Sequence, residues 1–270
     1  MKFIHVTDPH IVAPGKTLFG LDPRDRMEKC VASINAHHAD ADFCIWTGDL
    51  VHWGDREAYH VFREVLSDLT VPSHLVMGNH DGREALLEVF PDTPVDANGF
   101  VQYALDLPLG RFLILDTVQD GTHHGELCDA RLGWLDARLD EADRRNAYIF
   151  MHHPPMRVGM SGMDSPRLVG VEQFVEVVTG RGNVRHIFCG HLHRPIHGCW
   201  RGIPFSTLRA TSHAFKLSLK PTTGLVMTHE NPGYAIVLLK DGATVIHDHS
   251  YLEEGPEFEY KKERKKEAAD

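Results

Sequence analysis

Five short apolar runs in this chain end in clusters of Asp, Asn and His, and this repeated arrangement constrains the fold more than any other feature. Short runs rich in β-branched and aromatic residues are typical of buried strands. Polar residues that follow such strands meet at the carboxyl edge of an open α/β sheet. We therefore expect five distant segments to converge. In chain order the clusters are Asp8-Pro9-His10, Gly48-Asp49, Gly78-Asn79-His80-Asp81, His152-His153 and Gly190-His191-Leu192-His193.

The rest of the first 200 residues supports a layered α/β fold. Apolar residues at helical spacing follow Asp22-Pro23, Asp55 and Asp129, and Asp before Pro is a typical helix start. Alternation of strands and helices predicts sheets covered by helices, in one catalytic core spanning 1–200. The expected strands span 2–7, 42–47, 73–77, 111–116, 147–151 and 185–189.

The pattern changes near residue 200, where strand-like runs follow one another at 203–208, 224–228, 234–239 and 243–249. We expect an antiparallel meander over 201–258 that completes the second sheet or forms a cap or dimerisation element. A homo-oligomer is therefore expected. The segment 259–270 is expected to be a charged, solvated tail, with a nucleic-acid or membrane tether as the alternative.

Composition excludes several classes of protein. The net charge of −10 disfavours a binder of duplex nucleic acid, which needs basic surface. No apolar run approaches the roughly 18–20 residues of a membrane span, and Asp8 comes too early for a secretory signal. Five cysteines, an odd number with no Cys-x-x-Cys pair, argue against a disulfide framework. We expect a cytoplasmic protein without a membrane partner.

Histidine is the compositional anomaly, because it occurs 20 times in 270 residues and often in pairs. Imidazole is the commonest metal ligand in proteins. The five clusters offer Asp and Asn oxygens and His nitrogens but no thiolate, a donor set that suits Mn, Fe, Co or Zn. A single cluster is weak evidence, since an Asp after a strand is usually a turn residue. Five clusters at corresponding strand ends predict a metal centre.

The order DxH, GD, GNHD, HH and GHxH, from Asp8 to His193, resembles the calcineurin-like metallophosphoesterases over about 190 residues. The similarity is greatest to the class III cyclic nucleotide phosphodiesterases, the branch that includes glycerophosphodiesterases of the GpdQ type. The segments that carry it are HVTDPH, TGDLVHWGDREAY, IFMHHPP and IFCGHLH. The resemblance implies a four-layer αββα sandwich with two metal ions close together.

Carried over by position, the resemblance implies a ligand set for each ion, with Asp49 shared. It implies a catalytic role for His80, while Asp81 and His153 would orient the ligands. The chain departs from relatives that carry Tyr shortly after GD, because His52 stands in this region. The first ion would take Asp8, His10, Asp49 and His193, and the second would take Asp49, Asn79, His152 and His191.

The expected function is a dinuclear phosphodiesterase acting on small phosphodiesters, with 3′,5′- or 2′,3′-cyclic nucleotides first. The alternatives are a glycerophosphodiesterase and, more remotely, a non-catalytic metal-binding module. No Arg near the motifs would neutralise the second charge of a monoester. Substrate contacts are expected from His123, His124 and His197, although these are also ordinary surface loop positions. The methionine-containing segment 158–166 is either a flexible lid or a surface loop.

Overall fold

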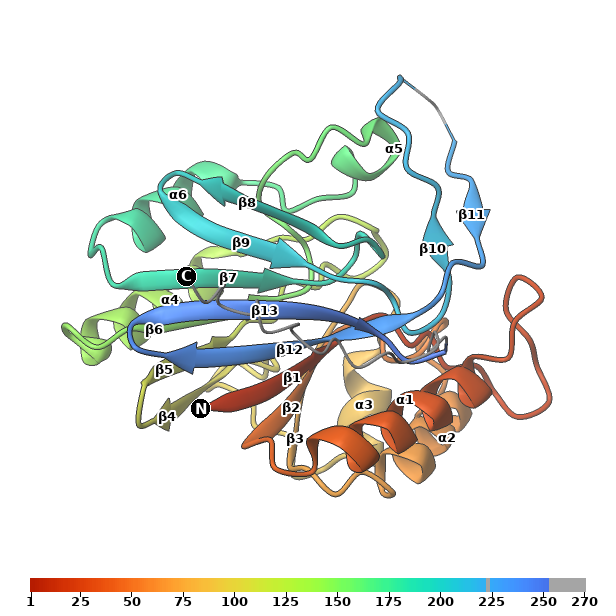
Figure 1. Cartoon of the computed structure of the whole chain (residues 1–270). Helices are drawn as coiled ribbons and strands as arrows, with labels where there is room; N and C mark the ends of the chain where they lie inside the picture. Colours follow the sequence, from red (N-terminus) through yellow and green to blue (C-terminus); the bar gives the residue numbers. More distant parts are fainter. Residues whose placement is uncertain (222–223, 253–270) are drawn as a thin grey trace, which may run out of the picture.

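The computed structural model describes residues 1–221 and 224–252, and it arranges them in four layers (Figure 1). Two sheets pack face to face, with helices α1–α3 outside one sheet and helices α4 and α6 outside the other. The expected αββα sandwich is confirmed.

The first sheet has the strand order β13-β12-β1-β2-β3. Its centre is parallel, because β1 pairs with β2 and β2 with β3 in that sense, whereas β12 runs antiparallel to both β1 and β13. The strands are β1 Lys2–Val6, β2 Phe43–Thr47, β3 Ser73–Val76, β12 Gly233–Lys240 and β13 Ala243–Ser250.

The second sheet has the order β4-β5-β6-β7-β9-β8. Strands β5, β6, β7 and β9 are parallel, and the outer strands β4 and β8 run antiparallel to their neighbours. The strands are β4 Tyr103–Leu107, β5 Gly110–Ile114, β6 Ala147–Met151, β7 Val184–Cys189, β8 Ile196–Trp200 and β9 Ile203–Thr207.

Six helices within residues 1–221 and 224–252 connect these strands. Asp22 caps α1, because its side chain accepts hydrogen bonds from the backbone N–H groups of Arg24 and Asp25. Asp55 precedes α2 but makes no such side-chain bond, and α4 begins at Asp129 itself. The helices are α1 Pro23–His38, α2 Arg56–Leu66, α3 Arg83–Val89, α4 Asp129–Ala142, α5 Ser161–Asp164 and α6 Val171–Thr179.

Aromatic side chains fill the space between the sheets. Phe3 of β1 stacks on Phe43 with ring centroids 4.9 Å apart, and it meets Phe150 and Phe188 of the opposite sheet edge to face. Such contacts stabilise beyond the burial of their area by about 0.5–1.5 kcal/mol per pair. The packing fixes the two sheets relative to each other, and therefore fixes the strand ends that face one another across the sandwich.

The expected meander after residue 200 is wrong as a single unit. Strand β9 joins the second sheet and strands β12 and β13 extend the first, while β10 Ala214–Phe215 and β11 Met227–Thr228 form a separate hairpin. In Figure 1 this hairpin stands away from both sheets beside α5. The strand-like pattern was correct locally, but strand pairing depends on the rest of the fold. The predicted tail at 259–270 lies outside the described residues.

None of the helices in the described part of the chain is long and apolar enough to cross a membrane.

Candidate metal centre

The carboxyl ends of β1, β2, β3, β6 and β7 lie at one edge of the sandwich, and their polar clusters meet there. One ligand atom from each of Asp8, His10, Asp49 and His193 lies within 4.8 Å of the others, and all four residues are buried. His193 Nε2 is 3.2 Å from Asp8 Oδ1 and 3.2 Å from His10 Nε2. Four buried donors converging in this way form a compact group suited to one cation.

A second group lies next to the first, across Asp49. Ligand atoms of His152, His153 and His191 also lie within 4.8 Å of one another. The Asp49 Oδ2 atom is 3.4 Å from His10 Nε2 in the first group and 3.4 Å from His152 Nε2 in the second. This single carboxylate oxygen therefore stands between the two groups.

The backbone that carries these side chains is strained. Nine non-glycine residues in the described part of the chain have positive φ, and five of them belong to the two groups. Each such conformation costs about 1–3 kcal/mol and persists only where the surroundings enforce it. The loops after β1 and β2 supply part of that support, because the Asp8 and His10 N–H groups donate to the Gly48 and Asp49 carbonyls. The five residues are Asp8, His10, Asp49, His191 and His193.

Two glycines allow the strands to approach closely at this point. A Cβ atom on Gly78 would overlap the Asp49 carboxylate, and one on Gly48 would lie 2.5 Å from His152 Nδ1. Gly48 also has φ +91°, a conformation that L side chains rarely adopt. Gly48 is therefore needed for space and for the turn, and Gly78 for space.

Several buried polar atoms of the centre have no hydrogen-bond partner among the described residues. Such orphaned atoms are rare, because each costs about 1–3 kcal/mol. The Asp8 carboxylate illustrates the arrangement, since Thr7 Oγ1 and the His191 N–H both donate to Oδ2 while Oδ1 is left open. This pattern fits bound cations, which would complete such atoms on the expected ligands Asp8, Asn79 and His191. The orphaned atoms here are Asp8 Oδ1, Asn79 Oδ1, His153 Nε2 and His191 Nε2.

The buried carboxylate and imidazoles of the centre shift one another's pKa values. Burial alone would raise the pKa of the Asp49 carboxyl, but the surrounding histidines, His152 foremost, hold it well below its usual range. Burial likewise would lower the pKa of His152, yet Asp49 raises it to about 9. Burial and then His152 lower the pKa of His191 to about 3, so its ring is neutral near pH 7. A neutral imidazole such as that of His191 has a free lone pair, which a cation requires, whereas His152 must lose its proton before it can bind one.

His80 and Asp81 have different environments. The His80 Nδ1–H donates to the His52 carbonyl at 2.8 Å, and this side chain, 24% exposed, places Nε2 4.0 Å from Asp49 Oδ2. Asp81 is buried and accepts hydrogen bonds from three backbone N–H groups and from the Tyr59 hydroxyl. Burial, followed by Asp49, raises the pKa of Asp81 to about 7. Asp81 thus braces the loops, whereas His80 faces the open side.

A cavity of about 380 Å³ opens above the two groups. Its floor includes Asp49, Asn79 and His191. No Lys or Arg lines it among the described residues. The apolar wall comes from the loop before α1, from α5 and the segment after it, and from the β10–β11 hairpin: Phe19, Met163, Pro166, Phe215, Leu225 and Met227. The cavity therefore combines polar donors, which suit a charged group, with apolar surface.

The three histidines expected to contact substrate differ in position. His123 lines the cavity, and its Nδ1 lies 3.2 Å from Asn79 Nδ2, which donates to it. That bond leaves Asn79 Oδ1 as the free oxygen of the amide. His124 does not line the cavity, and His197 lies exposed on β8. In the segment 158–166, Met163 reaches the cavity wall, and α5 gives part of the segment a helical turn.

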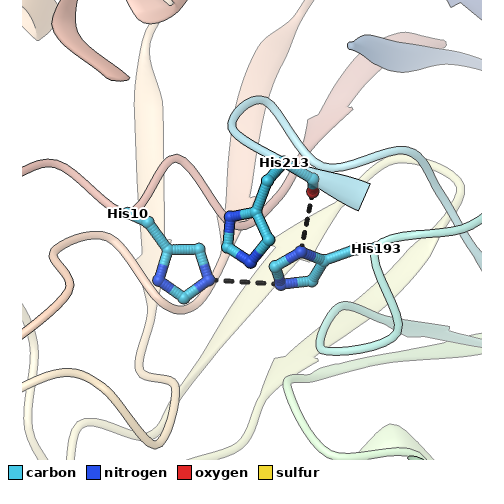
Figure 2. Close-up of side chains that lie close together, drawn as sticks. All are labelled: His10, His193 and His213. Carbon is cyan, nitrogen blue, oxygen red and sulfur yellow. Dashed lines mark hydrogen bonds between the residues drawn. The ribbon is translucent and has the colours of Figure 1, made fainter. Parts of the chain in front are cut away.

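Two histidines at the centre were missed as site residues. His213 has its ring 4.5 Å from that of His193, and its carbonyl accepts a hydrogen bond from His193 Nδ1 at 2.8 Å (Figure 2). His52 lies beside His10 and His80. The signal for His52 was its place just after GD, whereas no sequence motif surrounds His213.

Comparisons with known proteins identify the family of this chain. The family model for calcineurin-like phosphoesterases matches residues 1–195. A protein of Rhodopseudomonas palustris named "Probable cyclic nucleotide phosphodiesterase" is 42% identical, covering 96% of this chain and 95% of its own. A GpdQ-type protein of Arcobacter nitrofigilis is 30% identical over 86% of each chain. The 3′,5′-cyclic AMP phosphodiesterase CpdA of Escherichia coli K12 is 26% identical, covering 80% of this chain and 78% of its own.

Solved structures show the same fold. A dimetal phosphatase from Danio rerio superposes with a TM-score of 0.71 at 16% identity, covering 93% of this chain and 96% of that one. Together with the match over residues 1–195, these likenesses settle the family. The chain belongs to the calcineurin-like phosphoesterases.

Proposed function

We propose that this phosphodiesterase hydrolyses cyclic nucleotides at a centre of two cations. The observation that carries the proposal is the cavity, which joins a floor of Asp, Asn and His donors to an apolar wall. A cyclic nucleotide has matching parts, because its phosphodiester is anionic and its base is flat and apolar on both faces. The cavity volume also lies in the usual range for small-molecule sites.

The proposed ligand sets follow the two groups. Asp8, His10, Asp49 and His193 would hold the first cation. Asp49, Asn79, His152 and His191 would hold the second, with His153 and Asp81 orienting the ligands. Mn, Fe, Co and Zn all accept these donors. Such ions supply Lewis acidity and an activated water when bound.

His80 is proposed to assist the leaving group. Its Nδ1–H is engaged with the His52 carbonyl, so Nε2 is the atom left to face the cavity. A protonated Nε2 would stabilise negative charge on the phosphoryl oxygens and donate its proton to the departing alkoxide. An alkoxide is a poor leaving group, so this proton has a large effect in the hydrolysis of an alkyl diester.

Two features of the cavity favour a diester with a base. The lining holds no Lys or Arg among the described residues, so no permanently charged side chain neutralises the second charge of a monoester. Packing one face of a base against Met163, Leu225 and Met227 would remove apolar area from water at about 25 cal/mol per Å². A small polar alcohol gains little from such a wall.

The test is a substrate panel with Mn²⁺ added: 3′,5′-cAMP, 3′,5′-cGMP, 2′,3′-cAMP, glycerophosphocholine and p-nitrophenyl phosphate. We expect the largest kcat/KM for a cyclic nucleotide. The largest value for the monoester would contradict the diesterase assignment. A glycerophosphodiester in first place would instead support the second candidate, which the relatives named GpdQ favour.

Location and assembly belong to the same proposal. We propose a cytoplasmic enzyme, supported by five cysteines that are all free. We also propose a homo-oligomer, because exposed apolar side chains gather on the β10–β11 hairpin at Leu217, Leu219 and Val226. A monomeric mass by light scattering at micromolar concentration would contradict the oligomer.

The division at residue 200 is likewise proposed as a functional one, between the shared catalytic centre and later segments that shape its rim.

A further inference from the structure

His52 lies beside both the metal-facing His10 and the proposed proton donor His80, whose own rings are 4.9 Å apart. Its Nδ1 is 3.0 Å from His10 Nδ1, and its ring stacks on that of His80 with centroids 4.6 Å apart and an interplanar angle of 17°. We propose that His52 is a positioning residue with two separable actions: it fixes the ring and tautomer of His10, and it holds the ring of His80. This inference rests on the proposed function.

The action on His10 follows from hydrogen-bond chemistry. His10 Nε2 is the atom that faces the centre, 3.4 Å from Asp49 Oδ2 and 3.2 Å from His193 Nε2. For Nε2 to offer a lone pair, the single proton of the neutral ring must be on Nδ1. Nδ1–H can then donate to His52 Nδ1, which must accept and therefore carries its own proton on Nε2. Groups that orient a metal-facing histidine in this way strengthen it as a ligand.

The action on His80 is steric and local. The His52 carbonyl accepts from His80 Nδ1 and the His52 ring covers one face of the imidazole, so one residue limits both rotation and tilt of the His80 ring. His80 Nε2 is thereby held toward the cavity. A proton donor must be held within hydrogen-bond reach of its acceptor for efficient transfer.

His52 is itself well anchored. Its backbone N–H donates to the Ile11 carbonyl at 2.9 Å, and Ile11 and Val51 form a parallel bridge that continues the pairing of β1 and β2. The edges of Phe19 and Trp53 contact its ring, with centroids 5.8 Å and 4.6 Å away. Because the loop with His10 and the loop with His52 are hydrogen-bonded together, the two imidazoles remain in register.

Two substitutions separate the two actions. His52→Asn places a carbonyl oxygen close to the Nδ1 position, so it keeps the acceptor for His10 but removes the ring that covers His80. His52→Phe keeps a ring against His80 but removes the acceptor. Both retain the backbone carbonyl. His60→Asn, an exposed change on α2, is the matched control.

The first measurement is calorimetric titration of metal-free protein with Mn²⁺ alone, which requires no substrate. We expect His52→Phe to weaken one of two Mn²⁺ sites by about 10–100-fold, and His52→Asn to remain within about threefold of wild type. The second measurement compares kcat for phenyl and p-nitrophenyl esters of methyl phosphate at saturating Mn²⁺. We expect His52→Asn to lose more on the phenyl ester, whose leaving group is poorer.

The outcomes distinguish the inference from the function on which it rests. Wild-type Mn²⁺ affinity in His52→Phe would overturn the action on His10. Equal losses on both esters in His52→Asn would overturn the action on His80. Equal weakening of Mn²⁺ binding in both variants would indicate a merely structural role and overturn the proposal. Absence of diesterase activity in the wild type would instead contradict the proposed function and leave the Mn²⁺ result interpretable.

Discussion

At the scale of single residues, His80 differs from the metal-facing histidines in its exposure, because its side chain lines the cavity and is 24% exposed, whereas His10 and His193 are buried. We expect His80→Ala to retain both cations by elemental analysis yet lose roughly 10²–10⁴-fold in kcat, the usual contribution of general acid catalysis. The loss should shrink for a p-nitrophenyl leaving group, which needs no proton. Equal losses for good and poor leaving groups would restrict His80 to stabilisation of charge.

His123 and His124 give a second test at this scale, because they are adjacent in sequence but only His123 lines the cavity. His123 Nδ1 accepts a hydrogen bond from Asn79 Nδ2, so His123→Ala leaves the amide free to rotate. This change should lower the affinity of the second cation site by about 10-fold. His124→Ala should leave Mn²⁺ affinity unchanged. Identical Mn²⁺ titrations for the two variants would contradict this role of His123.

The residues of the centre could be predicted where a strand ends in them. Asp8, Asp49 and His152 each follow a buried strand, and position at a strand end carries over directly from sequence to space. His213 could not be found in this way. It reaches the centre because the backbone N–H groups of Thr211 and Ser212 donate to carbonyls at the exit of β1, a long-range contact that no local pattern encodes.

At the scale of elements, the β10–β11 hairpin supplies much of the apolar wall. Met227 and Val226 are neighbours with exposed side chains, at 40% and 62%, but only Met227 lines the cavity. We expect Met227→Ala to raise the KM for 3′,5′-cAMP roughly fivefold, from about 1 kcal/mol of lost apolar contact, with kcat retained. Glycerophosphoethanolamine, which has no base, should be unaffected. An equal rise in the KM for cAMP in Val226→Ala would contradict the assignment of the wall.

His5 on strand β1 gives a second prediction at the scale of elements. This residue is buried, it bonds Thr47 Oγ1 at 2.8 Å, and burial, then His186, lowers its pKa to about 3. As pH falls through 6.5, the ordinary pKa of histidine, His5 takes up a proton in the unfolded chain but stays neutral in the folded chain. The free energy of unfolding therefore decreases below about pH 6.5 and keeps decreasing toward pH 3.

Between pH 7.5 and 5.5, His5 should lower the free energy of unfolding by about 1.4 kcal/mol. His5→Gln can keep the bond to Thr47 but does not titrate. Urea denaturation of metal-free protein at both pH values measures the decrease in the free energy of unfolding on acidification. This decrease should be about 1.4 kcal/mol smaller in His5→Gln than in wild type, and unchanged in the exposed control His60→Gln. Equal acid loss in His5→Gln and wild type would contradict a neutral buried His5.

Three of the elements that the sequence did not predict are short or exposed. Helix α5 has only four residues, and α3 has seven, too short for helical spacing to be distinct from chance. Strand β8 has the sequence IHGCW and is largely exposed, so it lacks the apolar run of a buried strand. By contrast, β2 and β6 are buried at every position and were predicted almost to the residue. A fully buried strand can therefore be predicted from the sequence more closely than a short or exposed element.

At the scale of the whole molecule, the centre joins the two sheets. Asp8 and Asp49 come from the loops after β1 and β2 in the first sheet, whereas His152, His191 and His193 follow β6 and β7 in the second. The opposed carboxylates and imidazoles lie close together, because the aromatic core sets the distance between the sheets. Cations bound here would therefore link the two halves of the site.

This arrangement predicts a measurable gain in stability on metal binding. A cation that binds only the folded chain stabilises it by about 2.7 kcal/mol at 100 times its Kd, which for a domain of this size raises Tm by about 5–10 °C. We expect chelation by EDTA to lower Tm by this amount and added Mn²⁺ to restore it, measured by scanning calorimetry. Asp49→Ala, which removes the carboxylate between the two groups, should lose most of the response. An unchanged Tm in wild type would contradict ligands drawn from both sheets, because an ion held by the two halves must oppose their separation on unfolding.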